Sequence, residues 1–168
     1  RSSGLYVSPL LVLMLAAGIA FGYAAEILSY LAAVAMHELC HAAYAAKKGY
    51  TLSAFKLMPY GACLTGAFEG APPADEIKLA LVGPASNAVA AVATVALWWI
   101  APETYFYTEI FAAANVFTAL VNLVPVFPLD GGRALLAALS VKFRRARVYK
   151  GMRAAGLVFS LTLFGLAF

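Results

Sequence analysis

The sequence predicts an all-α polytopic membrane protein with about five transmembrane segments and a small β-hairpin after the second. Of its 168 residues, 64% are hydrophobic and only 12% are charged, whereas charged residues make up about 25% of a typical soluble domain. Uncharged apolar runs of about 20 residues, the length that crosses a bilayer, recur along the chain. Because these runs have no polar face, a soluble helical protein is excluded.

The first two predicted spans follow one another directly. Leu5–Ala25 is an uninterrupted apolar run of spanning length, and Glu26 ends it. Ile27–Ala46 is the second span. It is followed by the sequence Lys-Lys-Gly at positions 47–49, which adds positive charge and a helix-terminating glycine.

Residues 51–68 differ from the spans around them. Pro59, Tyr60 and Gly61 separate two short apolar stretches, a pattern typical of a β-hairpin. A plain connecting loop fits the pattern equally well. Either form of backbone is stable at membrane depth only where protein shields it or a wet cavity faces it.

Two further spans follow. Leu79–Ile100 ends in two tryptophans, an aromatic signature of the membrane interface. Ile110–Leu129 is interrupted by Asn122, Pro125 and Pro128, so we expect a broken helix there. Together with the second span, these segments form the predicted core, residues 27–46, 79–100 and 110–133 of a single domain covering 1–168.

The C-terminal part combines a basic loop with a short apolar segment. Val141–Gly151 is strongly basic, and Ala154–Phe168 would make about 22 Å of helix, short of a ~30 Å crossing. A chain truncated at both ends is consistent with this pattern. The positive charge at 141–151 is the kind that contacts anionic lipid.

The distribution of charge predicts the orientation. If the spans alternate in direction, all twelve basic residues fall on one side and only Glu26, Glu103 and Glu109 fall on the other. Positive residues concentrate on the cytoplasmic side of membrane proteins, so the N-terminus is predicted to be cytoplasmic. The net charge of +4 is accounted for in this way, and no nucleic-acid partner is expected.

The second span carries the pattern His-Glu-x-x-His at His37, Glu38 and His41. Residues four apart share one face of a helix, so the two imidazoles converge on one metal ion, and Glu38 lies where it reaches a water on that metal. Histidines that merely pack between helices are the alternative. Ionisable groups at membrane depth are costly and usually functional, which favours the metal site.

A catalytic zinc site needs a third protein ligand and an open position for water. Asp130 is the best candidate, because we expect it to end a proline-broken helix at a depth comparable to the histidines. Its alternative role is to cap the helix beginning at Gly131. Cys40 is a weaker candidate ligand that we interpret as a packing residue.

Three motifs resemble the signatures of the site-2 protease family of intramembrane zinc metalloproteases. They are His37-Glu38-Leu39-Cys40-His41, then Gly83-Pro84-x-x-Asn87, and then Asn122-x-x-Pro125-x-x-Pro128-Leu129-Asp130-Gly131-Gly132. The resemblance implies one Zn²⁺ per chain held by His37, His41 and Asp130. It implies Glu38 as general acid/base, and Asn87 and Asn122 as groups that position substrate or stabilise the oxyanion.

The spacing of the motifs resembles the compact branch of that family, which lacks a PDZ domain and processes a sporulation factor. The implied function is hydrolysis of a peptide bond in or near a transmembrane segment of a membrane-anchored substrate, in the plasma membrane of a prokaryote. The active site would lie near the cytoplasmic face, and the 51–68 hairpin would receive the unwound substrate as an added strand. A membrane zinc transporter or metal-binding protein is the alternative, because it too places histidines and acids in spans.

Overall fold

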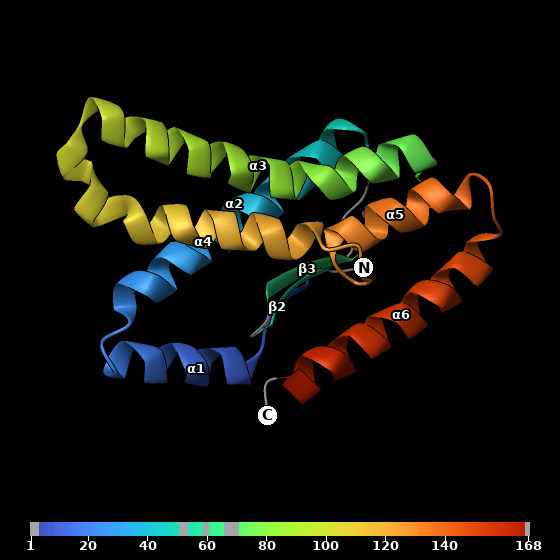
Figure 1. Ribbon diagram of the computed structural model, residues 1–168, viewed down its shortest axis with the longest axis horizontal. Helices are drawn as coiled ribbons and strands as arrows, with labels where there is room; N and C mark the ends of the chain where they lie inside the picture. Colours follow the sequence, from blue (N-terminus) through green and yellow to red (C-terminus); the bar gives the residue numbers. More distant parts are fainter. Residues whose placement is uncertain (1–3, 51–53, 59–60, 66–70, 167–168) are drawn as a thin grey trace.

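The computed structural model describes residues 4–50, 54–58, 61–65 and 71–166, which form a predominantly helical bundle with one small sheet (Figure 1). In chain order its elements are β1 (Gly4–Val7), α1 (Pro9–Ala20), α2 (Ala24–Lys47), β2 (Ala54–Met58), β3 (Gly61–Thr65), α3 (Pro73–Ile100), the 3₁₀ helix η1 (Pro102–Thr104), α4 (Tyr105–Leu123), α5 (Asp130–Ser140) and α6 (Arg145–Leu166).

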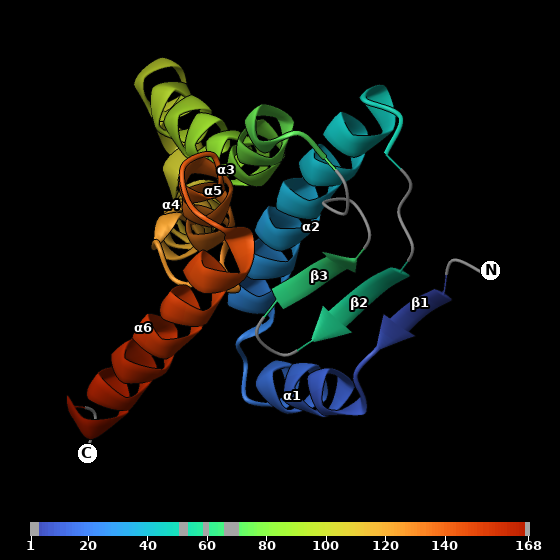
Figure 2. The same cartoon turned by 90° about the vertical axis from the view of Figure 1, so that its right-hand side faces the viewer.

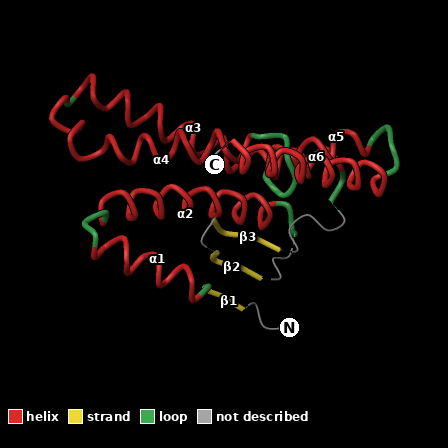
Figure 3. Tube along the Cα trace, turned by 60° about the horizontal axis from the view of Figure 1, so that its bottom comes forward, coloured by secondary structure: helices red, strands yellow, loops and turns green. Residues whose placement is uncertain are grey.

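The centre of the molecule is a three-helix core of α2, α3 and α4. Helices α3 and α4 run antiparallel, joined by η1, and α2 packs against both (Figure 3). Helix α1 and the sheet lie on the other side of α2, while α5 continues the line of α4 and packs on α3. The core helices therefore correspond to the predicted second, third and fourth spans.

The packing of this core is the reverse of that in a soluble protein. Seven of the twelve buried apolar residues that the structure describes are alanines. Large apolar side chains point outward instead, as at Trp99, which is 87% exposed, and Phe106, which is 79% exposed. Small residues that let helix backbones approach closely, with bulky apolar residues turned outward, are typical of helices packed in lipid.

Among the described residues, two helical stretches are long and apolar enough to cross a bilayer, Pro73–Ile100 and Pro102–Leu123. Helix α1 is apolar but has only 12 residues. Helix α2 has the necessary length, 24 residues, but carries the charged and polar residues of the His-Glu-x-x-His motif. The structure thus shows a helical protein with helices able to cross a membrane, and the count of five spans stays a prediction.

The first predicted span is wrong as a single helix. Residues 4–7 form a strand, and the helix runs only from Pro9 to Ala20. The residue before a proline is driven out of the helical conformation, and Ser8 is extended, with φ −65° and ψ 130°. At the other end Gly22 adopts φ +89°, a left-handed conformation that stops the helix. The apolar composition of this segment gave no indication of the two helix breaks, at Ser8 and at Gly22.

The segment predicted as a hairpin contains two antiparallel strands. Strand β2 pairs with β3 in the register Ala54↔Thr65 through Met58↔Gly61. A third strand, β1, pairs with β2 in parallel and was not predicted. The strand order β1-β2-β3 leaves β1 and β3 as edges, with β3 nearest to α2 (Figure 2). Residues 51–53, 59–60 and 66–70, including Pro59 and Tyr60, lie outside the described residues.

The predicted fourth span ends earlier than expected, and Asp130 begins a helix rather than ending one. Helix α4 stops at Leu123, because Pro125 drives Val124 into extended backbone (φ −58°, ψ 128°). The chain then forms a tight loop over residues 124–129 before α5 begins. A Cβ atom on Gly132 would collide with the backbone of Val126, so only glycine permits this turn to press against α5.

The basic segment predicted as a loop is mostly helical. Helix α6 begins at Arg145 and runs to Leu166, instead of beginning at Ala154. Arg145 forms a two-point ion pair with Glu76 at the start of α3, with N–O distances of 2.5 and 2.7 Å. Glu76 is buried, so this pair fixes the start of α6 against the core.

Candidate metal centre

Helix α2 presents three functional side chains to the interior of the bundle. His37, Glu38 and His41 are all buried. The two imidazoles lie one turn apart, edge to face, with ring centroids 4.6 Å apart. The predicted convergence of the two histidines on one face of the helix is what the structure shows.

Asp130 is far from these histidines in the sequence, but its carboxylate contacts both of them. Its Oδ2 lies 2.9 Å from Nε2 of His37 and 3.2 Å from Nε2 of His41, and the two Nε2 atoms are 3.0 Å apart. Asp130 is the first residue of α5, whose N-cap is Leu129, and no side chain caps this helix. The alternative role of Asp130 as a cap is therefore not what its carboxylate does here.

Backbone and amide oxygens determine which ring nitrogen of each histidine carries hydrogen. Nδ1 of His41 lies 2.7 Å from the carbonyl oxygen of Leu79, and Nδ1 of His37 lies 2.7 Å from Oδ1 of Asn87. Both oxygens only accept hydrogen bonds, so both Nδ1 atoms must be the donors. In the neutral rings, each Nε2 then presents a lone pair toward Asp130.

Gly83 lets helix α3 approach the site closely. A Cβ atom at this position would collide with Nε2 of His41 and would lie 2.7 Å from Nε2 of His37. Pro84, which follows, is fully buried inside α3. The second motif therefore brings the backbone of α3 against the imidazoles, a role for Gly83 that only the structure reveals.

Glu38 lies beside this cluster rather than in it. It is buried, and it is close enough to His37, His41 and Asp130 to interact with them electrostatically. Arg133, one turn after Asp130 on α5, also contributes to its electrostatic environment. Glu38 is therefore next to the position where the nitrogen and oxygen atoms of His37, His41 and Asp130 meet, without occupying it.

The three asparagines of the core differ in what they contact. Asn87 contacts His37 directly and is fully buried. Asn122 donates to the carbonyl oxygen of Thr118 in its own helix, at 3.0 Å, and does not join the hydrogen bonds of the histidines. Asn115, which the sequence reasoning missed, is fully buried and accepts a hydrogen bond from Asn87 at 2.8 Å.

The signal that could have found Asn115 is an amide between apolar neighbours in the middle of α4, at a depth where unpaired polar groups are costly. Cys40, the weaker candidate ligand, is a half-buried free thiol. Among the described residues, the group whose ligand atoms could share a metal ion is His37, His41 and Asp130, with all three atoms within 4.8 Å of one another.

Two histidines four apart, a carboxylate from a distant helix and an adjacent buried glutamate make up the residue pattern of metalloprotease sites, enclosed here by apolar helices. The model of Peptidase family M50 matches residues 100–163, from α4 into α6. The chain is 28% identical over 163 residues to Stage IV sporulation protein FB of Bacillus subtilis. That alignment covers 95% of the chain and 56% of that protein.

It is also 30% identical over 157 residues to the putative zinc metalloprotease Rip3 of Mycobacterium tuberculosis, an alignment covering 81% of the chain and 36% of that protein. Its fold matches the solved site-2 protease from Methanocaldococcus jannaschii with a TM-score of 0.77 and 24% identity, over 97% of the chain and 80% of that structure. These comparisons confirm the predicted resemblance to the site-2 protease family. The chain spans about half or less of the length of these two curated relatives.

Proposed function

We propose that residues 1–168 form one intramembrane zinc metalloprotease domain, which hydrolyses a peptide bond in or near a transmembrane segment of a membrane-anchored substrate. The observation that carries this proposal is the convergence of His37, His41 and Asp130 beside the buried Glu38. The similarity to proteins named zinc metalloprotease and site-2 protease supports it.

The donor set fits a zinc ion. The Nε2 atoms of the two imidazoles face each other at 3.0 Å. Because both neutral rings carry their hydrogen on Nδ1, no hydrogen is present between the two Nε2 atoms to form a hydrogen bond. Such an arrangement of lone pairs beside a carboxylate is stabilised by a cation, and two nitrogens with one oxygen suit zinc in a catalytic site. Zinc, when bound, would polarise the scissile carbonyl and bring the pKa of a water toward neutrality.

Glu38 is proposed as the general acid/base. Its carboxylate takes a proton from the attacking water and later gives it to the nitrogen of the leaving amine. Burial among apolar helices suits this role, because proton exchange then stays within the site rather than with bulk water. The chain's own contribution to the chemistry is thus a proton carrier held next to three converging ligand atoms.

Of the two proposed amides, Asn122 is the better candidate for contact with substrate or oxyanion. Asn87 already uses its amide nitrogen on the carbonyl oxygen of Ala33 and on Oδ1 of Asn115, at 3.0 and 2.8 Å. An amide nitrogen carries two hydrogens, so Asn87 has none left for an oxyanion. Asn122 uses one hydrogen on Thr118 and keeps a second.

The edge of β3 is the proposed acceptor for the unwound substrate. A transmembrane helix hides its carbonyl groups, so the segment to be cut must first extend and then needs partners for its backbone. Strand β3 is an edge of the sheet and contacts α2, the helix that bears His37 and Glu38. Addition of a strand there would supply those hydrogen bonds.

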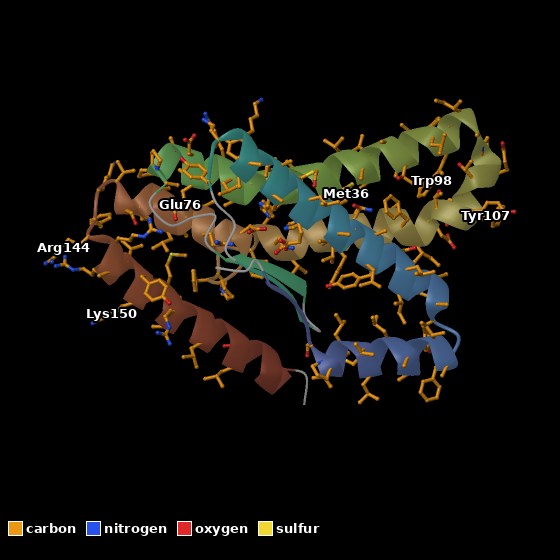
Figure 4. The ribbon with its side chains drawn as sticks, turned by 180° about the vertical axis from the view of Figure 1, so that it is seen from behind. Met36, Glu76, Trp98, Tyr107, Arg144 and Lys150 are labelled. Carbon is orange, nitrogen blue, oxygen red and sulfur yellow. The ribbon has the colours of Figure 1, made fainter. Side chains whose placement is uncertain are left out.

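The proposed orientation puts the α5–α6 turn in the cytoplasm of a prokaryotic cell. Glu76, Arg144 and Lys150 lie at one end of the molecule, while Trp98 and Tyr107 lie at the other (Figure 4). Basic residues at one end and aromatic residues at the opposite end match the positive-inside rule and an interfacial aromatic belt. We extend this to the N-terminus, which is proposed to be cytoplasmic, in a chain of about five spans.

The test is Glu38→Gln in proteoliposomes that contain a membrane-anchored substrate. The substitution removes the proton-carrying group and keeps the shape, so cleavage should fall by at least about 100-fold. Zinc content should stay at the wild-type value. Persistent cleavage would contradict the assignment of Glu38. If zinc crosses the bilayer and no substrate is cut by the wild type, the chain is a transporter instead.

A further inference from the structure

We infer that Asn115 is a positioning residue for the metal centre, acting through Asn87 to fix the hydrogen of His37 on Nδ1. This inference rests on the proposed metal site and extends it to a residue on α4 that touches no ligand atom. Asn115 and Asn87 are both 0% exposed, although each carries an amide. Buried amides in an apolar bundle are retained where each of their polar atoms has a partner.

The hydrogen bonds form one directed series. Nδ2 of Asn115 donates to the carbonyl oxygen of Phe111 at 2.8 Å. Since that carbonyl can only accept, Oδ1 of Asn115 must face Asn87, where it accepts from Nδ2 at 2.8 Å. Oδ1 of Asn87 is thereby directed at Nδ1 of His37, 2.7 Å away. A backbone carbonyl on α4 thus helps to set which nitrogen of a histidine on α2 is protonated.

The contact with Asn115 matters because the other partner of Asn87 is shared. Nδ2 of Asn87 also donates to the carbonyl oxygen of Ala33 at 3.0 Å. Ala33 lies within α2, so its carbonyl already accepts the amide hydrogen of the residue four positions on. Oδ1 of Asn115 is a side-chain atom and accepts no hydrogen bond of the helix backbone. Its contact with Nδ2 of Asn87, at 2.8 Å, is also shorter than that of the Ala33 carbonyl, at 3.0 Å.

Loss of the Asn115 oxygen would weaken the orientation of Asn87. An Asn87 amide turned by half a rotation would present Nδ2 to Nδ1 of His37, which would then have to accept. The hydrogen of that imidazole would move to Nε2, the atom that faces Asp130. A ring protonated at Nε2 cannot ligate a metal through it, and partners of this kind typically change metal affinity by about 10–100-fold.

The experiment measures zinc affinity of the purified full chain by competition with a chelator, for three variants of helix α4. Asn115→Leu removes the oxygen at similar volume and should weaken zinc binding by about 10–100-fold. Asn115→Asp keeps an oxygen toward Asn87, and its neutral carboxyl can donate to Phe111 in place of the amide, so affinity should return to within about threefold of the wild type.

Thr118→Val is the matched control. Thr118 is buried one turn along the same helix and donates only to the carbonyl oxygen of Ala114, at 2.7 Å. Its loss should leave zinc affinity unchanged. Thermal unfolding of the metal-free proteins checks that the variants compared are folded. If Asn115→Leu does not fold, Asn115→Ser takes its place in the comparison with Asn115→Asp. The shorter serine side chain keeps an oxygen but does not bring it within reach of Asn87.

Equal zinc affinity in the wild type and in Asn115→Leu would overturn the inference. So would equal losses in the Leu and Asp variants, because a purely structural defect would not be rescued by an oxygen. If the wild type binds no zinc at all, the proposed metal site itself is wrong. The two failures are therefore distinguished by the wild-type measurement alone.

Discussion

Gly83 is the residue at which helix α3 comes closest to the two histidines. Substitution with alanine would place a Cβ atom against Nε2 of His41 and 2.7 Å from Nε2 of His37. Atoms of the packed interior cannot move far to relieve such contacts. We expect Gly83→Ala to displace the imidazoles and to lower zinc affinity at least about tenfold, measured by competition with a chelator.

Gly151→Ala is the control for this substitution. Gly151 lies in α6, and apart from its chain neighbours and the backbone of its own helix no atom lies within 4 Å of the position that its Cβ would take. In an exposed helix alanine is favoured over glycine by about 1 kcal/mol, so this variant should be slightly more stable and bind zinc normally. Unchanged zinc affinity in Gly83→Ala would mean that α3 does not press on the histidines as the structure indicates.

At the scale of residues, the sequence predicted the convergence of His37, His41 and Asp130 better than their surroundings. The spacing of His37 and His41 fixes their shared helical face, and Asp130 followed from depth, so their convergence was predictable. The partners of Asn87 were not, because they depend on how α3 and α4 pack. Asn115 is one amide in an apolar run, and nothing local distinguishes it from a side chain that bonds only within its own helix.

At the scale of elements, one ion pair joins the start of α6 to the start of α3. The Glu76 side chain is 4% exposed and that of Arg145 is 51% exposed, so the two partners are not equivalent. Removing Arg145 leaves a buried carboxylate without its cation, whereas removing Glu76 leaves a cation that water reaches. We expect Arg145→Met to cost about 1–3 kcal/mol of unfolding free energy and Glu76→Gln less than about 1 kcal/mol.

Thermal or denaturant unfolding in detergent compares these two variants. The partly buried pair at the end of α2 serves as the reference: Lys48 lies 2.9 Å from Asp75, whose carboxylate raises the pKa of the Lys48 amino group. Its removal by Lys48→Met should change stability less than Arg145→Met does. If Glu76→Gln lowers the free energy of unfolding more than Arg145→Met does, the burial of Glu76 does not decide which of the two substitutions is more destabilising.

The order of the strands in the sheet determines where strand addition can be tested. Strand β2 is central in the sheet, so prolines at Phe55 or Leu57 would break its own pairing. Strand β3 is an edge, and adjacent residues of an edge strand direct their N–H groups to opposite sides. Of Ala62→Pro and Cys63→Pro, only one removes a donor from the free edge, and that one should reduce cleavage while zinc content stays constant.

Cleavage assays of both proline variants in proteoliposomes, with zinc content measured in parallel, make this comparison. Equal and normal cleavage by both variants would exclude substrate addition at β3. Equal loss in both, together with lower thermal stability, would show that the sheet is needed for folding and would leave no role for its free edge in selecting substrate.

Helix boundaries were less predictable from the sequence than helix identity. The three core helices lie where apolar runs of spanning length lie, because burial against lipid and neighbouring helices requires such runs. The break at Pro9 was missed, since a proline is also tolerated in the first turn of a longer helix. The start of α6 at Arg145 was missed because basic residues look like a loop unless a buried partner such as Glu76 is known.

At the scale of the whole molecule, the two ends differ in chemistry, and this predicts the topology. Tyr107 and Arg144 are exposed and lie at opposite ends of the bundle (Figure 4). On a background in which Cys40 and Cys63 are serine, Tyr107→Cys should react with a membrane-impermeant thiol reagent in intact cells. Arg144→Cys should react only after permeabilisation. The reverse pattern would contradict the positive-inside assignment.

The inward-facing alanines and outward-facing aromatics also belong to this scale. They indicate that lipid, rather than water, covers the bundle, an environment in which a buried cluster of two histidines and two acids is costly and is usually functional. Composition was sufficient to predict this environment. The close approach of the helices, which alanines and Gly83 permit, required the structure.

X-ray absorption spectroscopy of the purified, zinc-loaded chain tests most directly whether His37, His41 and Asp130 hold the metal. We predict one zinc per chain, with a first shell made only of nitrogen and oxygen at about 2.0–2.2 Å, two imidazoles among them. Asp130→Ala should lower the zinc content or replace the carboxylate with water. A sulfur ligand at about 2.3 Å, which would implicate a cysteine such as Cys40, or the absence of stoichiometric zinc, would contradict the site.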